Sequence, residues 1–199
     1  MKDMRCELIS WPEVQRLCLQ LAKQIKASAF RPDVVVAIGR GGYVPARLLC
    51  DYLDIMALTS IKIELYSCST KMQKALIKYP LCSDISNQRV LLIDDVNDSG
   101  ETLKLALAHL QSFQPGEIRT AVMHHKSTSL FPVDYYASKV ISWRWLIYPW
   151  AIYEDVCGFL RNMTPVTDNI EQSQQYLIDK FKVRISKKQL REIIDLMNA

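Results

Sequence analysis

The side chains best suited to chemistry in this sequence lie within the nine residues DDVNDSGET, Asp94 to Thr102. The stretch opens with two adjacent carboxylates, whose oxygens accept hydrogen bonds from sugar hydroxyls or bind a magnesium ion. It continues with a third acid, two hydroxyls and Gly100 at the expected start of a helix, where free backbone amides attract a phosphate monoester. Acceptors for a sugar beside a cradle for a phosphate predict that this stretch binds a ribose phosphate.

A second stretch with the composition of an anion site is Gly39-Arg40-Gly41-Gly42, which follows an apolar run from Asp33 to Ile38. Its glycines permit positive φ angles and let backbone amides approach a ligand closely. The next expected helix, from Val44 to Leu53, adds the positive end of its dipole. A turn that only reverses the chain has the same composition, so the glycines alone leave both interpretations open.

Strand and helix patterns alternate around these two stretches. Apolar runs predict strands at 33–38, 59–66, 89–93, 118–123 and 140–148, and apolar residues at helical spacing predict helices after Ser10, at 44–53 and at 103–113. This alternation predicts an α/β fold with a mostly parallel sheet flanked by helices and a ligand site at the carboxyl ends of the strands. Ser67 to Asn87 shows no period, and we expect a mobile loop there that closes as a lid, with Ser69, Thr70 and Lys71 as contacts.

Beyond Arg161 the sequence predicts two short helices on either side of Lys182 to Ser186. We therefore expect a main domain over residues 1–160 and a C-terminal helical extension over residues 161–199. The lysines and arginines between Lys180 and Arg191 fit a solvated helix face, and contact with nucleic acid is the alternative.

Composition is that of a globular protein with one main domain, because 49% of the 199 residues are hydrophobic and 23% are charged. The net charge of +4 is weaker than the dense basic stripe of a dedicated nucleic-acid binder, so nucleic acid is not an expected partner. The six cysteines and the pair His124-His125 lack metal-ligand spacing, which predicts buried thiols and structural histidines. Charges at the N-terminus and the lack of an apolar run of roughly 20 residues favour a cytoplasmic protein without membrane helices.

Three stretches resemble motifs of the type I phosphoribosyltransferases. LLIDDVNDSGETL, from Leu91 to Leu103, resembles the signature that binds phosphoribosyl pyrophosphate. IGRGGYVPA, from Ile38 to Ala46, is similar to the pyrophosphate loop of the branch that acts on xanthine, guanine and hypoxanthine, and WRWLIYPW, from Trp143 to Trp150, to the base-binding hood of that branch. The resemblance covers roughly the first 160 residues.

The resemblance implies the family's fold with a small hood, and a reaction of purine salvage. A 5-phosphoribosyl group would pass from phosphoribosyl pyrophosphate to a 6-oxopurine base, with Mg²⁺ as cofactor and the nucleoside monophosphate and pyrophosphate as products. Asp94 and Asp95 would hold the ribose hydroxyls and the magnesium-bound substrate, and Arg40 and Gly41 would meet the pyrophosphate. The 5′-phosphate would bind at Ser99, Gly100, Glu101 and Thr102.

The same resemblance names residues for the base. Asp98 would act as acid and base near the purine imidazole nitrogen, and Lys126, for which a solvated loop lysine is the alternative, would donate to the exocyclic oxygen. Trp145 would stack on the base, and Leu146 would offer backbone contacts. Trp143, on the same face of the predicted strand as Trp145, is expected to pack in the core.

Other functions stay open at this point. A regulator that senses phosphoribosyl pyrophosphate and binds nucleic acid through its basic tail would need the sugar-phosphate cradle but not Asp98 and Lys126 together. A third reading is the same fold acting on adenine or a pyrimidine. Ala151 stands where the purine branch often has an acidic residue, with Glu154 and Asp155 further on, so a second metal contact and the base preference are open. The family also implies a homodimer.

Overall fold

The structure is a computed structural model that describes residues 4–67, 73–163 and 169–198. It divides into two compact units, which we call the sheet unit, Val14–Trp143, and the terminal unit, Met1–Glu13 with Arg144–Ala199. The expected lid contacts Ser69, Thr70 and Lys71 lie outside the described residues. The expected boundary at residue 160, between the main domain and the C-terminal extension, stays a prediction.

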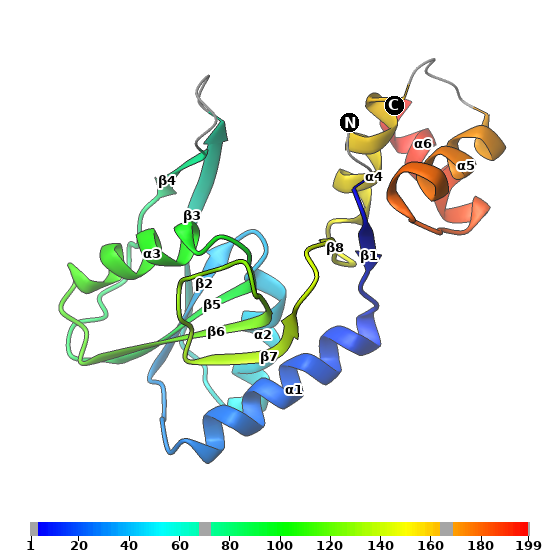
Figure 1. Cartoon of the computed structure of the whole chain (residues 1–199). Coiled ribbons are helices and arrows are strands. Elements are labelled where there is room, and N and C mark those ends of the chain that lie inside the picture. Colours follow the sequence, from blue (N-terminus) through cyan, green and yellow to red (C-terminus); the bar gives the residue numbers. More distant parts are fainter. Residues whose placement is uncertain (1–3, 68–72, 164–168, 199) are drawn as a thin grey trace. The chain divides into compact units, whose positions relative to one another are not determined.

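The sheet unit contains a six-stranded sheet whose strands lie in the order β4-β3-β2-β5-β6-β7 (Figure 1). All neighbouring strands are parallel except β3 and β4, which form an antiparallel pair. This confirms the predicted α/β class with a mostly parallel sheet. The strands are β2 (Val34–Gly39), β3 (Leu58–Ser67), β4 (Gln73–Tyr79), β5 (Arg89–Asn97), β6 (Glu117–Lys126) and β7 (Tyr135–Val140).

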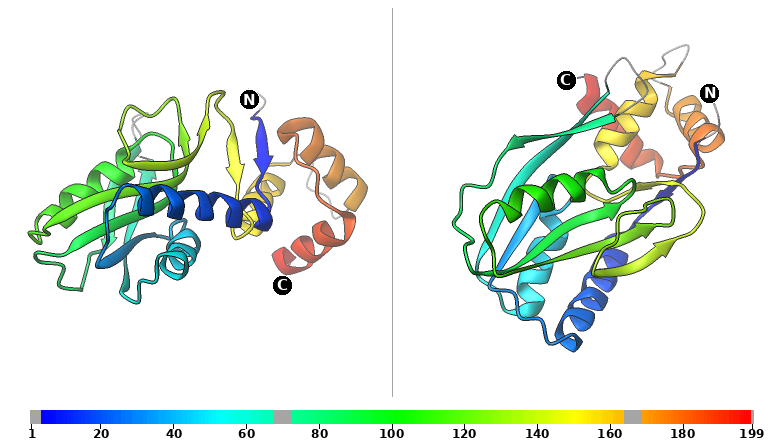
Figure 2. Two further views of the ribbon diagram at one scale, coloured as in Figure 1. Left: turned by 90° about the horizontal axis from the view of Figure 1, so that it is seen from below. Right: turned by 60° about the vertical axis from the view of Figure 1, so that its left-hand side comes forward.

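Helices cover both faces of this sheet, because its central strands are apolar on both faces. Helix α3 (Glu101–Gln111) lies on one face and α2 (Tyr43–Leu53) on the other (Figure 2). Val122 packs in the cluster under α3, whereas the next residue of β6, Met123, contacts Cys18 of α1 (Trp11–Ala27) with 3.7 Å between the sulfur atoms. Since successive strand residues point to opposite faces, α1 lies on the face opposite α3.

The terminal unit is built on a short parallel pair of strands, β1 (Cys6–Leu8) and β8 (Trp145–Ile147). Three helices pack against it: α4 (Ile152–Arg161), α5 (Ile170–Phe181) and α6 (Lys187–Asn198). The last two are the helices predicted on either side of Lys182 to Ser186. They share one hydrophobic core with β8 and α4, whose fully buried members include Ile147, Val156, Leu177 and Leu190. No helix in the described ranges is long and apolar enough to cross a membrane.

Two predictions of local structure are wrong. The expected loop from Ser67 to Asn87 contains β4, which pairs with β3, and the inward-facing Ala75 and Ile77 of β4 pack against the core. Their alternation was obscured by the apolar but exposed Leu76 between them. The strand expected at 140–148 is two strands, β7 and β8, because the two halves pair with different neighbours, Val140 with Lys126 and Trp145 with Cys6.

Candidate active site

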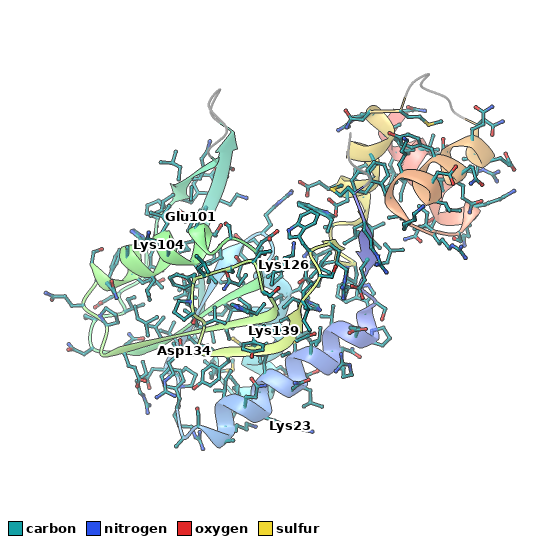
Figure 3. All side chains as sticks on the ribbon, in the orientation of Figure 1. Lys23, Glu101, Lys104, Lys126, Asp134 and Lys139 are labelled. Carbon is teal, nitrogen blue, oxygen red and sulfur yellow. The ribbon has the colours of Figure 1, made fainter. Side chains whose placement is uncertain are left out.

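The carboxyl ends of three neighbouring strands, β2, β5 and β6, carry most of the predicted site residues. Arg40 and Gly41 follow β2, Asp94 and Asp95 are among the last four residues of β5, and Lys126 is the last residue of β6. Figure 3 shows Lys126 at this end of β6, with Glu101 at the start of α3. Parallel pairing of β5 with both β2 and β6 brings these ends to one edge of the sheet, where open α/β sheets bind their ligands.

The acid pair is held tightly at this edge. Asp94 is buried, and one of its carboxylate oxygens accepts a hydrogen bond from the Asp95 backbone N–H at 2.9 Å. Burial, together with the adjacent Asp95 carboxylate, raises the pKa of Asp94 well above its usual value. The Asp95 carboxylate lies against Gly41, where a Cβ atom would come within 2.4 Å of a carboxylate oxygen. A side chain at position 41 would therefore have to displace the Asp95 carboxylate from its present position.

The phosphate loop, Asp98 to Thr102, leads into α3 through Gly100, a position that other residues can occupy only with strain. Gly100 has a φ angle of +89°, and a Cβ atom there would lie 2.3 Å from the Cβ of Phe131. As the N-cap of α3, Gly100 brings no side chain to the first-turn amides. These amides, with the exposed Ser99 and the half-buried Thr102, form the end of the helix that favours a phosphate group.

The start of the phosphate loop is anchored by the preceding residue, Asn97, for which the sequence predicted no role. Asn97 is 1% exposed, and its amide group donates to the Phe131 carbonyl at 2.9 Å and contacts His125 Nδ1 at 3.0 Å. The side-chain carbonyl of Asn97 accepts a hydrogen bond from the Ser129 hydroxyl at 2.9 Å. A buried amide with every group engaged fixes the start of the loop, and the segment after β6 supplies most of its partners.

Asp98 forms the chemical centre of the site with Lys126 and Trp143. Lys126 Nζ lies 2.6 Å from Asp98 Oδ2, and the Trp143 indole N–H donates to Asp98 Oδ1, with 3.1 Å between the heavy atoms. Lys126 Nζ also lies 4.6 Å from the centroid of the Trp143 ring, within cation–π range. The Lys126 side chain is only 3% exposed, whereas that of Asp98 is 39% exposed. The Asp98 carboxylate is therefore accessible to solvent, while Lys126 and Trp143 each hold one of its two oxygens.

These contacts decide between several readings of the sequence. Lys126 is buried in a strand, so it is not the solvated loop lysine of the alternative. Trp143 lies outside β8 and is 43% exposed, so the prediction that it packs in the core on the strand face of Trp145 is wrong. His124 is buried, and His125 stacks on Tyr136 with 5.3 Å between ring centroids, in keeping with structural roles.

Two of the residues predicted to contact the base, Trp145 and Leu146, belong to the terminal unit. Trp145 and Leu146 lie in β8, where Leu146 is buried and Trp145 is 39% exposed. The Trp145 indole N–H donates to Asp155 Oδ1 at 3.0 Å. Burial raises the pKa of Asp155 to about 6, an effect that the Trp145 hydrogen bond opposes and the nearby Glu154 reinforces. The contact of Trp145 and Leu146 with a base stays a prediction.

Comparison with known proteins places these features in a family context. The model of the phosphoribosyl transferase domain matches residues 6–155. A hypoxanthine-guanine phosphoribosyltransferase of Saccharomyces cerevisiae is 28% identical over 189 residues, covering 72% of this chain and 85% of that protein. A xanthine-guanine phosphoribosyltransferase of Cereibacter sphaeroides is 29% identical over 148 residues, covering 71% and 84%. The solved structure of a purine phosphoribosyltransferase from Pyrococcus horikoshii is 30% identical with a TM-score of 0.65, covering 74% and 94%.

Proposed function

The chain belongs to the phosphoribosyl transferase domain family, and from this premise we propose that it transfers the 5-phosphoribosyl group of phosphoribosyl pyrophosphate to a 6-oxopurine, namely hypoxanthine, guanine or xanthine. The relatives named for these bases support the choice of a purine. The observation that carries the proposal is the contact between Asp98 and the buried Lys126, because a site that only binds the sugar phosphate needs the cradle but not this pair.

In the proposed reaction a purine ring nitrogen attacks C1 of the ribose. The bond between C1 and the pyrophosphate oxygen breaks, its electron pair leaves with the pyrophosphate, and the proton of the imidazole N–H passes to Asp98. Lys126 carries three N–H donors and can contact both the Asp98 carboxylate and the exocyclic oxygen of a 6-oxopurine. The Trp143 indole N–H donates to the other Asp98 oxygen, which restricts the orientation of the carboxylate that would accept the proton.

The ribose and phosphate would bind as two neighbouring subsites of one element. Asp94 and Asp95 at the end of β5 would accept hydrogen bonds from the ribose hydroxyls, and the amides and hydroxyls from Ser99 to Thr102 would hold the 5′-phosphate. Arg40 and the amide of Gly41 would meet the pyrophosphate. Gly41 and Asp95 already lie in contact, so the pyrophosphate and ribose subsites would be continuous.

The family implies a divalent metal, and the acid pair fits Mg²⁺. Mg²⁺ is usually held by one or two carboxylates together with substrate phosphates and water, and Asp94 and Asp95 supply such a pair of oxygen donors. In the described ranges no group of three or more His, Cys, Asp or Glu side chains forms a closed metal cage. When bound there with the substrate, Mg²⁺ would neutralise charge on the departing pyrophosphate.

A panel of bases tests this function. We would incubate the protein with Mg²⁺, phosphoribosyl pyrophosphate and, in turn, hypoxanthine, guanine, xanthine, adenine and uracil, and identify the nucleotide by mass spectrometry. Nucleotides from one or more of the three 6-oxopurines are expected. Product from adenine or uracil alone would move the protein to another base class, and no product with any base would favour a regulator. The expected homodimer and cytoplasmic location stay predictions, the first of which light scattering checks.

A further inference from the structure

A cavity of about 420 Å³ lies within the terminal unit, and its lining is strongly basic. Three segments far apart in the sequence form it: β1 with the residue before it, the residue before β8, and the connection between α5 and α6. The volume is in the range of pockets that hold small ligands. The lining residues are Arg5, Cys6, Glu7, Leu8, Arg144, Lys182 and Arg184.

The charges around this cavity are unbalanced. Four cations face one carboxylate, Glu7, which leaves a net charge of +3 in the lining. Glu7 accepts a hydrogen bond from Arg144 Nε, and Lys182 Nζ donates to the Asp179 carbonyl at 3.1 Å. Across residues 4–67, 73–163 and 169–198, the guanidinium groups of Arg5 and Arg184 have no ionic or hydrogen-bonding partner.

The backbone holds the cations of the α5–α6 connection in place. Lys182 ends α5 with a φ angle of 60°, and its N–H and that of Val183 donate to carbonyls of the last helical turn. Val183 and Ile185 are buried in the core of the terminal unit, at 1% and 7% exposure. Because residues alternate between inside and outside along this connection, Lys182 and Arg184 point away from the core. Their positions are therefore fixed by packing before any ligand arrives.

The backbone also fixes the position of Arg5, which precedes β1 on the other side of the cavity. Cys6 is buried in that core, and the carbonyl of Arg5 accepts a hydrogen bond from the Trp145 N–H at 2.9 Å. The backbone of Arg5 is thus tied to β8, although its side chain is exposed. Ordering the backbone in advance reduces the entropy that binding must overcome, which favours a specific site over a loose basic surface.

We propose that this cavity binds a small molecule with a diphosphate group, such as inorganic pyrophosphate or a nucleoside diphosphate. A phosphate group carries about −1.5 to −2 charges at neutral pH, so two of them balance the net charge of the lining. Arginine forks match phosphate oxygens in pairs, and two of the three arginines are free to bind them.

A small ligand fits better than nucleic acid. Outside the cavity, the cations of α5 and α6 are interspersed with Glu171, Asp179, Glu192 and Asp195, and Lys187 is paired with Glu171 at 2.8 Å. No continuous basic stripe follows these two helices in the described part of the chain, whereas binding along a nucleic-acid backbone requires one. The positive charge is concentrated in a concave site instead.

Isothermal titration calorimetry with inorganic pyrophosphate and with GDP, in the presence of Mg²⁺, tests the site in the full chain. The informative variant is the double substitution Arg5→Ala with Arg184→Ala. The matched control is Lys188→Ala with Arg191→Ala, which removes two exposed cations of α6 outside the cavity. Each hydrogen bond to a charged group contributes about 1.5–3 kcal/mol, so the first variant should bind at this site at least 100-fold more weakly, and the control should bind as the wild type does.

The count of sites separates this proposal from the proposed function. If both hold, the wild type binds two pyrophosphates per chain and the cavity variant binds one. If the catalytic proposal fails and the cavity proposal holds, the wild type binds one pyrophosphate per chain and the cavity variant binds none. Equal affinity of wild type and cavity variant, or an equal loss in the control variant, would overturn the site.

Two further arms keep the test decisive. Binding of GDP but not of pyrophosphate at the cavity would identify the nucleoside as part of the ligand, and the reverse would identify the bare diphosphate. A single-stranded oligonucleotide that binds through Arg5 and Arg184 while neither diphosphate does would refute the small-molecule assignment. Should the double variant fail to fold, as judged by circular dichroism, Arg184→Gln alone should still weaken binding by about tenfold.

Discussion

The pair of Asp98 and Lys126 should respond asymmetrically to removal of either partner, because only Lys126 is buried. Asp98→Ala leaves an ammonium group that is 3% exposed without its carboxylate. Breaking a buried pair by removing one partner costs about 3–5 kcal/mol, and the partial exposure of Asp98 puts this pair at the lower end of that range. We therefore expect Asp98→Ala to lower the free energy of unfolding by about 3 kcal/mol.

Lys126→Met should cost much less. It fills the same space with an apolar side chain and leaves a carboxylate that is 39% exposed to water and still bound by the Trp143 indole. A loss of about 1 kcal/mol is expected, and the double variant should be more stable than Asp98→Ala alone because no buried charge remains. Urea unfolding of the ligand-free protein, followed by circular dichroism, measures all three. A larger loss for Lys126→Met than for Asp98→Ala would refute the reasoning.

Three further substitutions test other parts of the account. Trp143→Phe removes the indole donor from Asp98, so kcat should fall by about tenfold while KM for phosphoribosyl pyrophosphate stays unchanged; a change confined to KM would contradict this role. Gly100→Ala should destabilise the protein by about 1–3 kcal/mol because its φ angle is +89°, whereas Gly158→Ala, where a Cβ atom meets nothing within 4 Å, should not; equal effects in urea unfolding would exclude strain at Gly100. The pKa of Asp155 is raised to about 6, so its ionisation destabilises the fold as the pH rises from about 4 to about 6; Asp155→Asn should raise Tm relative to the wild type at pH 7.5 but not at pH 4, and a pH-independent difference would contradict the assignment.

The parts of the fold that depend on local pattern could be predicted from the sequence. Helices α1, α2, α3, α5 and α6 follow from apolar residues at helical spacing, and Ser10 caps α1 by accepting from the Glu13 N–H at 3.3 Å. The central strands β2, β5 and β6 follow from continuous apolar runs. Strand β4 was missed because the apolar but exposed Leu76 obscures its alternation, so its pairing with β3 identifies it more clearly than its composition does.

The candidate site likewise has parts that could be predicted from the local sequence and parts that could not. The acid pair and the phosphate loop lie in one continuous stretch, so their neighbourhood could be predicted from spacing alone. The contact between Asp98 and Trp143 joins residues 45 positions apart, and Asn97 depends on Ser129 and Phe131 after β6. Such contacts depend on the path of the chain between elements, which periodicity does not report. For the same reason the sequence did not show that Trp143 and Trp145 belong to different units.

The most direct test of the central claim separates catalysis from binding at Asp98. Asp98→Asn keeps one acceptor oxygen for Lys126 and the shape of the side chain, but removes the carboxylate that would take the purine proton. The measurement compares kcat for nucleotide formation from hypoxanthine with the Kd for phosphoribosyl pyrophosphate in the wild type and this variant. We expect kcat to fall by about 10²–10⁴-fold while Kd changes by less than about threefold. Equal losses in both quantities, or an unchanged kcat, would contradict the assignment of Asp98 as the catalytic base.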